Sequence, residues 1–149
     1  MIELIILGDP VAQGRPRFNS YTKRAHDPVK SKNYKLFVGH EARKQYHGPL
    51  VDCPIRVEID VYRKNNKGTS KKEIVRREKK LSMPIVKPDI DNYVKGIKDA
   101  LNGVIWIDDN LVVELEAKKY YSINPRIEVR ILEINMENKN DNEMEKINH

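Results

Sequence analysis

Three stretches of this chain alternate apolar and polar side chains with a period of two, and this pattern constrains the fold most. From residue 55 to 62 every second side chain is aliphatic, and the same alternation recurs over residues 111–118 and 127–131. Successive side chains of a β-strand point to opposite faces, so we expect three strands that each bury one face. The apolar run Ile2–Leu7 indicates a fourth strand, and Asn124-Pro125 suggests a hairpin-like connection between the last two.

Two other segments have the pattern of helices. The first should begin at Asp27-Pro28, which suit an N-cap and a first helical position, and end before Gly48-Pro49. The second covers residues 90–101, where four aliphatic side chains fall on one narrow stripe at 100° per residue. Asp89 is a suitable N-cap for this second helix, and Gly103 is a suitable stop.

The charge of the chain indicates a polyanionic partner. The 149 residues include 28 Lys or Arg and 22 Asp or Glu, for a net charge of +6. The last 17 residues hold five acids and two bases, so the first 132 carry a net charge of +9. A nucleic acid is the first candidate for such a partner, although many basic proteins bind none.

Much of the positive charge lies in one stretch. Residues 63–80 contain nine Lys or Arg and only two Glu. The first half of this stretch has the composition of a loop, with room for a helical turn after it. A solvated, mobile loop is one interpretation. Next to a site that cuts phosphodiester bonds, the same stretch could instead grip backbone phosphates.

Length and composition limit the class of protein. We expect one domain over residues 1–134, and an acidic, Asn-rich, disordered tail over residues 135–149. The single cysteine, Cys53, excludes an internal disulfide framework and a multi-cysteine zinc site. No apolar run reaches about 20 residues and no secretory signal is visible, so a cytoplasmic protein without a membrane span is expected. The phosphate-binding loop of nucleotide-binding enzymes is also missing from the sequence, so no nucleotide cofactor is expected.

Acidic residues cluster at the start of the second helix and in a turn that follows it. These are Asp89, Asp91 and the Asp108-Asp109 pair, and Lys95 lies one turn after Asp91. Carboxylates without Cys or His suit Mg²⁺ or Mn²⁺, which activate water in phosphodiester hydrolysis. A structural interpretation stays open: Asp89 as a cap only, Asp91 and Lys95 as a surface pair, and the Asp pair as a turn.

The run KPDIDNYVKGIKDALNG, followed by WIDDNLVVELEAKKYY, resembles the signature of the RusA family of Holliday junction resolvases. That signature is KPD-x-DN-x-x-K-x-x-x-DAL-x-G, then DD and a strand ending in lysine. The segment GRPRF, Gly14 to Phe18, is similar to the arginine-containing loop of the family. The resemblance extends from Ile2 to about Ile134 and is densest over Lys87 to Tyr121. The acidic tail and the long basic loop depart from the pattern.

The resemblance implies roles for individual residues. The three metal-binding catalytic aspartates of the family fall on Asp89, Asp91 and Asp109, and its catalytic lysine falls on Lys95. Asp108 also matches, and it could orient Asp109 without binding the ion itself.

A second group of residues is expected to contact DNA. Arg15 and Arg17 lie in the matching loop, and Lys119 occupies the position of the strand lysine, which contacts phosphate or is merely structural. With the basic stretch included, the expected DNA-contacting residues are Arg15, Arg17, Lys71, Lys72, Arg76, Arg77 and Lys119. Trp106, in contrast, is expected in the core or at a dimer interface.

Together these patterns predict an α+β domain, with a small mixed sheet of about four strands and two main helices packed on it. The resemblance implies a homodimeric, Mg²⁺-dependent enzyme, often prophage-borne, that resolves four-way junctions by paired nicks and leaves 5′-phosphate and 3′-hydroxyl ends. Mn²⁺ is expected to substitute for Mg²⁺. Two alternatives stay open: a less selective nuclease of branched or flapped DNA, and an accessory protein that binds junctions without cutting.

Overall fold

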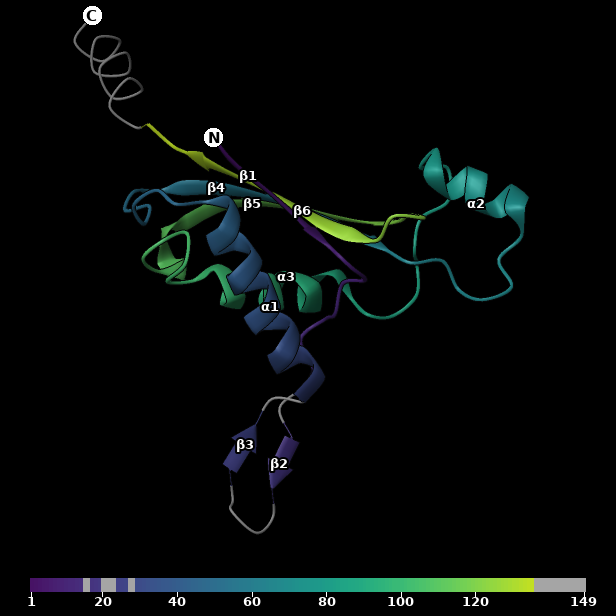
Figure 1. Ribbon diagram of the computed structural model, residues 1–149, viewed down its shortest axis with the longest axis horizontal. Helices are drawn as coiled ribbons and strands as arrows, with labels where there is room; N and C mark the ends of the chain where they lie inside the picture. The colour runs from purple at the N-terminus through teal and green to yellow at the C-terminus, as the bar shows by residue number, and fades with distance from the viewer. Residues whose placement is uncertain (15–16, 20–23, 27–28, 136–149) are drawn as a thin grey trace, which may run out of the picture.

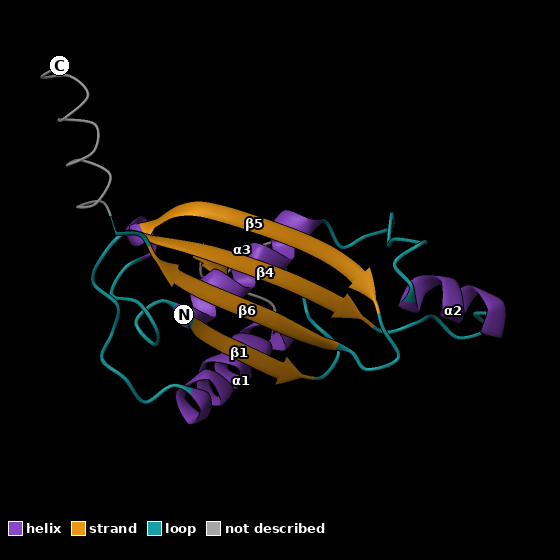
Figure 2. Cartoon of the chain, turned by 90° about the horizontal axis from the view of Figure 1, so that it is seen from above, coloured by secondary structure: helices purple, strands orange, loops and turns teal. Residues whose placement is uncertain are grey.

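The centre of the computed structural model, which describes residues 1–14, 17–19, 24–26 and 29–135, is a four-stranded mixed sheet (Figure 2). Its strands, in the order β1-β6-β4-β5, are β1 (Ile2–Leu7), β6 (Arg126–Glu133), β4 (Ile55–Arg63) and β5 (Val112–Tyr121). β4 is parallel to β5 and antiparallel to β6, which is antiparallel to β1. The predicted α+β class and the number of strands in the mixed sheet are confirmed.

Two helices, α1 (Val29–Gln45) and α3 (Ile90–Leu101), lie on the same side of this sheet (Figures 1 and 2). They approach closely at Gly39, where an added Cβ would lie 3.2 Å from the carbonyl oxygen of Ala100. A side chain at this position would crowd the α3 backbone, so glycine favours the close approach of the two helices. The two predicted main helices are therefore confirmed, although the expected cap at Asp27-Pro28 lies outside the described residues.

The core lies between the sheet and these helices. The four aliphatic side chains of β4 that alternate in the sequence are completely buried. From α3, Val94, Ile97 and Leu101 enter the same core, while Ile90 is only half-buried at its edge. Trp106 is 0% exposed, which confirms the expectation that it lies in the core or at an interface.

On β6, β4 and β5 the opposite face of the sheet is polar and its charges are paired, whereas β1 exposes Ile5 and Leu7 there. Arg130 donates hydrogen bonds to Glu58 and Asp60, at 2.9 and 3.0 Å, and Arg56 donates to Glu116 at 2.6 Å. The hydrogen bonds from Arg130 and Arg56 hold the pKa of Glu58 below its ordinary value. The four strands hold six Lys or Arg and seven Asp or Glu, so the net positive charge of the chain lies outside the sheet.

The expected hairpin-like connection between the last two strands is wrong. β5 and β6 do not pair with each other, because β4 lies between them and pairs with both. Residues 122–125 therefore cross over the end of β4. β4 has the most completely buried inner face of the sheet, so it occupies a central position. Strands that follow one another in the sequence usually pair, but here the burial of β4 separates β5 from β6.

The basic stretch is more ordered than the sequence indicates. Residues 71–78 form a helix, α2 (Lys71–Glu78), which begins at Ser70, whose hydroxyl accepts a hydrogen bond from the Glu73 amide at 3.2 Å. α2 lies beyond one end of the sheet (Figure 2), while the short hairpin of β2 (Arg17–Asn19) and β3 (Arg24–His26) precedes α1 (Figure 1). Within the described ranges, no helix is both long and apolar enough to cross a membrane.

Candidate active site

Helix α3 begins where the sequence predicts, with Asp89 at its N-cap. The Asp89 backbone is extended, with φ −68° and ψ 150°, yet its carboxylate accepts no capping hydrogen bond from the described residues. The side chain is exposed, and it lines a depression of about 450 Å³ together with Gln13, Lys87 and Asn92. Capping therefore does not occupy the oxygens of Asp89, and they are accessible to a ligand.

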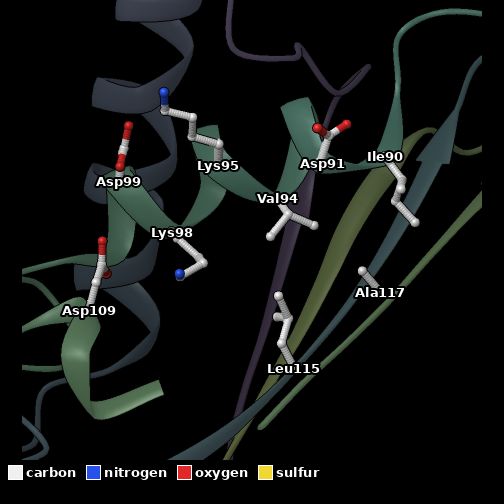
Figure 3. A pocket seen from close by; sticks show the side chains of 9 residues that line it. All are labelled: Ile90, Asp91, Val94, Lys95, Lys98, Asp99, Asp109, Leu115 and Ala117. Carbon is white, nitrogen blue, oxygen red and sulfur yellow. The ribbon is translucent and has the colours of Figure 1, made fainter. Parts of the chain in front are cut away.

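Asp91 and Lys95 lie one turn apart on the exposed side of α3. Both line a groove of about 340 Å³ between α3 and β5, and its floor is apolar, with Leu115 and Ala117 on the β5 side (Figure 3). The ion pairs among the described residues do not include an Asp91–Lys95 pair. The structural interpretation of Asp91 and Lys95 as a surface ion pair is therefore not supported by this geometry.

Asp109 is hydrogen-bonded to a buried side chain of the core. It begins a short 3₁₀ turn, η1 (Asp109–Leu111), and its Oδ1 accepts a hydrogen bond from the indole nitrogen of buried Trp106 at 2.8 Å. Asp108 caps the same turn, because its Oδ1 accepts from the Asn110 amide at 2.9 Å. Asp108 thus stabilises the turn that carries Asp109. This hydrogen bond is to the backbone of Asn110 and not to the Asp109 side chain.

One chain does not bring all the expected metal ligands together. Figure 3 places Asp109 beside the Asp99 end of the groove, and Asp91 toward its other end. An α-helix rises about 1.5 Å per residue, so Asp91 and Asp99 are separated by about 12 Å along α3. Within the described part of a single chain, no three His, Cys, Asp or Glu side chains lie close enough to hold a metal ion.

The expected DNA-contacting residues lie in different parts of the molecule. Arg15 lies outside the described residues, and Arg17 is described only as part of strand β2. On α2, the side chains of Lys71, Lys72 and Arg76 are exposed. These three form a basic surface at one end of the sheet, beyond the groove.

Arg77 has a different environment. Its guanidinium lies 3.7 Å from the centre of the Tyr121 ring and donates hydrogen bonds to Glu73 and Asn65, at 3.3 and 3.0 Å. The side chain is only 14% exposed. Arg77 therefore fastens α2 to the end of β5.

Lys119, on the inner face of β5, also contacts protein. Its ammonium donates to the carbonyl oxygens of Val86 and Pro88, both at 3.0 Å. Arg63, at the end of β4, donates to the carbonyl oxygen between them, that of Lys87, at 2.8 Å. Sequence reasoning did not single out Arg63, and it did not assign the indole of Trp106 to Asp109. The only signal for the latter was that a buried indole N–H needs a partner.

These observations define a class: a small α+β domain that exposes aspartates and a lysine of the kind used in metal-dependent hydrolysis of phosphodiesters. A family model described as endodeoxyribonuclease RusA matches residues 8–132, so the chain belongs to the RusA endodeoxyribonuclease family. Nucleases of this family generally depend on a divalent metal ion. The chain is also similar to an uncharacterized protein, YqaN, of Bacillus subtilis (strain 168), with 44% identity over 137 residues, 89% of this chain and 96% of that relative.

Proposed function

We propose that this protein is a Mg²⁺-dependent endodeoxyribonuclease that resolves four-way DNA junctions by paired symmetric nicks during recombination and repair. Membership of the RusA family supports the reaction class. The observation that carries the proposal is the state of Asp89, Asp91 and Lys95, which are exposed at one end of α3. Asp89 accepts no cap hydrogen bond from the described residues, and Asp91 does not pair with Lys95 there. A purely structural cap or ion pair would occupy these groups.

The donor set fits a hard divalent cation. Asp89, Asp91 and Asp109 offer carboxylate oxygens, which suit Mg²⁺ and also allow Mn²⁺ to substitute. When bound, the ion would activate a water molecule and neutralise charge on the phosphate. In this proposal Asp108 holds turn η1 in place and does not bind the ion itself.

The side chains around this set have separate tasks. The Lys95 ammonium, on the same face of α3 as Asp91, would stabilise negative charge that develops on the phosphate oxygens. The Trp106 indole holds Oδ1 of Asp109 by a hydrogen bond, and in this proposal Oδ2 would bind the ion. The family resemblance implies products with 5′-phosphate and 3′-hydroxyl ends.

We further propose that the enzyme is a homodimer, in which Asp109 of the partner subunit completes the carboxylate set. The separation of Asp109 from Asp91 within one chain supports this arrangement. Near Asp109, apolar side chains are left uncovered: Ile107, Val113 and Leu115 are 49%, 59% and 46% exposed. Exposed apolar patches often mark protein interfaces. A two-fold dimer could present two identical sites to opposed strands of a four-way junction, which has approximate two-fold symmetry.

For DNA binding, we propose the exposed Lys71, Lys72 and Arg76 of α2 as phosphate contacts, although Arg76 also pairs with Glu73 at 3.6 Å. Arg77, which was expected to join them, supports their position through Tyr121. Arg15 and Arg17 remain proposed contacts on the strength of the family resemblance. The paired charges on the outer face of the sheet make that face a poor alternative for a polyanion.

Replacing Lys71 and Lys72 together by Gln is expected to weaken junction binding and to flatten its salt dependence. Each phosphate contact that is lost should lower the slope of log K against log salt by about 0.9 on duplex arms. The matched control is Lys44→Gln with Lys118→Gln, which removes the same charge from side chains paired with Glu41 and Glu116. Equal slopes for the two double variants would show that α2 is only a solvated surface.

One assay separates the proposed function from its alternatives. Purified protein is incubated with a labelled four-way junction, a linear duplex and a flap, each with Mg²⁺ and with a chelator. We expect paired cuts in the junction alone, and only with Mg²⁺. Comparable cutting of the flap would favour a less selective nuclease of branched DNA. Tight binding without any cutting would favour an accessory protein.

A further inference from the structure

Three consecutive carbonyl groups immediately before α3 are held by cationic side chains. Lys119 donates to the carbonyl oxygens of Val86 and Pro88, and Arg63 donates to that of Lys87. Hydrogen bonds from charged donors are stronger than those between neutral groups. The segment that leads directly to Asp89 is therefore fastened at each of its last three residues.

The two cations come from neighbouring positions on the paired strands β4 and β5. Arg63 ends β4, where it pairs in register with Tyr121, and Lys119 lies two residues earlier on β5. Residues 82–89, in contrast, belong to no helix or strand. The hydrogen bonds to the carbonyls thus connect an irregular segment to the sheet.

The connection bears on Asp89 because no side-chain cap within the described residues fixes its carboxylate. In the described part of the chain its side chain makes no hydrogen bond that would tie it to α3. Its carbonyl oxygen accepts hydrogen bonds from the amides of Asn92 and Tyr93 in α3, at 3.2 and 3.4 Å. The position of the carboxylate is therefore set by the backbone on both sides of Asp89, and the preceding side is the segment held by Lys119 and Arg63. Two of the three N–H groups of the Lys119 ammonium are already used by carbonyl oxygens, which leaves little capacity for phosphate.

We propose that Lys119 and Arg63 are positioning residues, which hold residues 86–88 so that the Asp89 carboxylate meets the metal ion, and that Lys119 is not a phosphate contact. This proposal rests on the proposed function, because it assumes that Asp89 binds the ion. Loss of a group that orients a metal ligand typically lowers metal affinity about 10–100-fold. A lost phosphate contact would instead weaken DNA binding and reduce its salt dependence.

The test compares Lys119→Met, which keeps the aliphatic stem but removes the donors, with Lys119→Arg, which keeps donors at this position. Mn²⁺ binding to the protein alone is followed by the loss of the free-ion electron paramagnetic resonance signal. Junction binding in chelator is measured over a range of salt. For Lys119→Met we expect Mn²⁺ affinity about tenfold weaker, a higher Mg²⁺ requirement for cutting, and an unchanged salt slope. Lys119→Arg should recover most of the affinity.

A salt slope that falls by about 0.9, with Mn²⁺ affinity unchanged, would overturn the proposal in favour of a phosphate contact. If Lys119→Met does not fold, Arg63→Gln is measured in the same way, and wild-type Mn²⁺ affinity in that folded variant would also overturn it. Different results would refute the proposed function and the positioning role. Wild-type protein that neither binds Mn²⁺ nor cuts junctions would refute the proposed function, whereas wild-type behaviour of the variants refutes only the positioning role.

Discussion

Asp91→Asn should reduce junction cutting by about 100-fold or more while junction binding survives. The substitution preserves shape but removes one negative charge from the proposed metal site. Binding depends mainly on basic side chains elsewhere, so it should persist in chelator, or tighten as repulsion between carboxylate and phosphate is relieved. Single-turnover cleavage and binding of the same labelled junction measure the two effects separately.

Asp99→Asn is the matched control, because it makes the same change on the same helix. Asp99 is exposed beside the groove but lies 3.8 Å from Lys35 of α1, so its charge is used in an ion pair. We expect near-wild-type cutting by this control, and losses like that of Asp91→Asn for Asp89→Asn and Asp109→Asn.

A structural role for Asp89 and Asp91 leads to a different result. A lost cap or surface pair would lower stability by about 1 kcal/mol and leave cutting intact. Near-wild-type cleavage by folded Asp91→Asn protein would therefore remove Asp91 from the site. Lys95→Ala should also lose cutting, while the affinity for the metal ion stays largely unchanged.

Mixing two inactive variants is expected to restore activity if each site is built from two chains. In a heterodimer of Asp91→Asn with Asp109→Asn, one shared site carries both substitutions and the other carries neither. Random exchange should make about half of the dimers heterodimers, each with one intact site. The mixture should therefore nick one strand of the junction, although neither variant alone cuts.

The control is a mixture of Asp91→Asn with Asp89→Asn, which lie on the same chain segment. In that heterodimer each site has one substituted aspartate, so no activity should return. Light scattering should give about twice the 17.4 kDa mass of the chain for every protein used. A monomer with full activity, or a failure of Asp91→Asn and Asp109→Asn to complement after verified exchange, would exclude the shared site.

Local patterns in the sequence were sufficient to predict most elements of the fold. The alternation over residues 55–62 and the stripe on residues 90–101 each identify one element, because burial on one face directly determines residue type. They do not determine strand order. The placement of β4 between β5 and β6 depends on how completely each strand can be buried, which is a property of the assembled sheet.

The candidate site, like the fold, was predictable from the sequence only in part. The sequence identifies Asp89, Asp91 and Lys95 as one group, since they share the start of a single helix. It also suggests Asp109, but its distance from Asp91 depends on the path of residues 102–108 around the end of α3. The contacts of Lys119 could not be predicted either, because a lysine in a strand has the same sequence pattern whether it meets phosphate or a carbonyl group.

The hydrogen bond between Trp106 and Asp109 gives this protein an intrinsic optical reporter. The chain contains one tryptophan, it is completely buried, and its indole N–H is bonded to the carboxylate of Asp109. Fluorescence excited in the indole band therefore originates from a single position, directly beneath a proposed ligand of the metal ion. Docking of a second subunit, or loading of an ion next to Asp109, alters the surroundings of that one emitter, so assembly of the site can be followed without an attached dye.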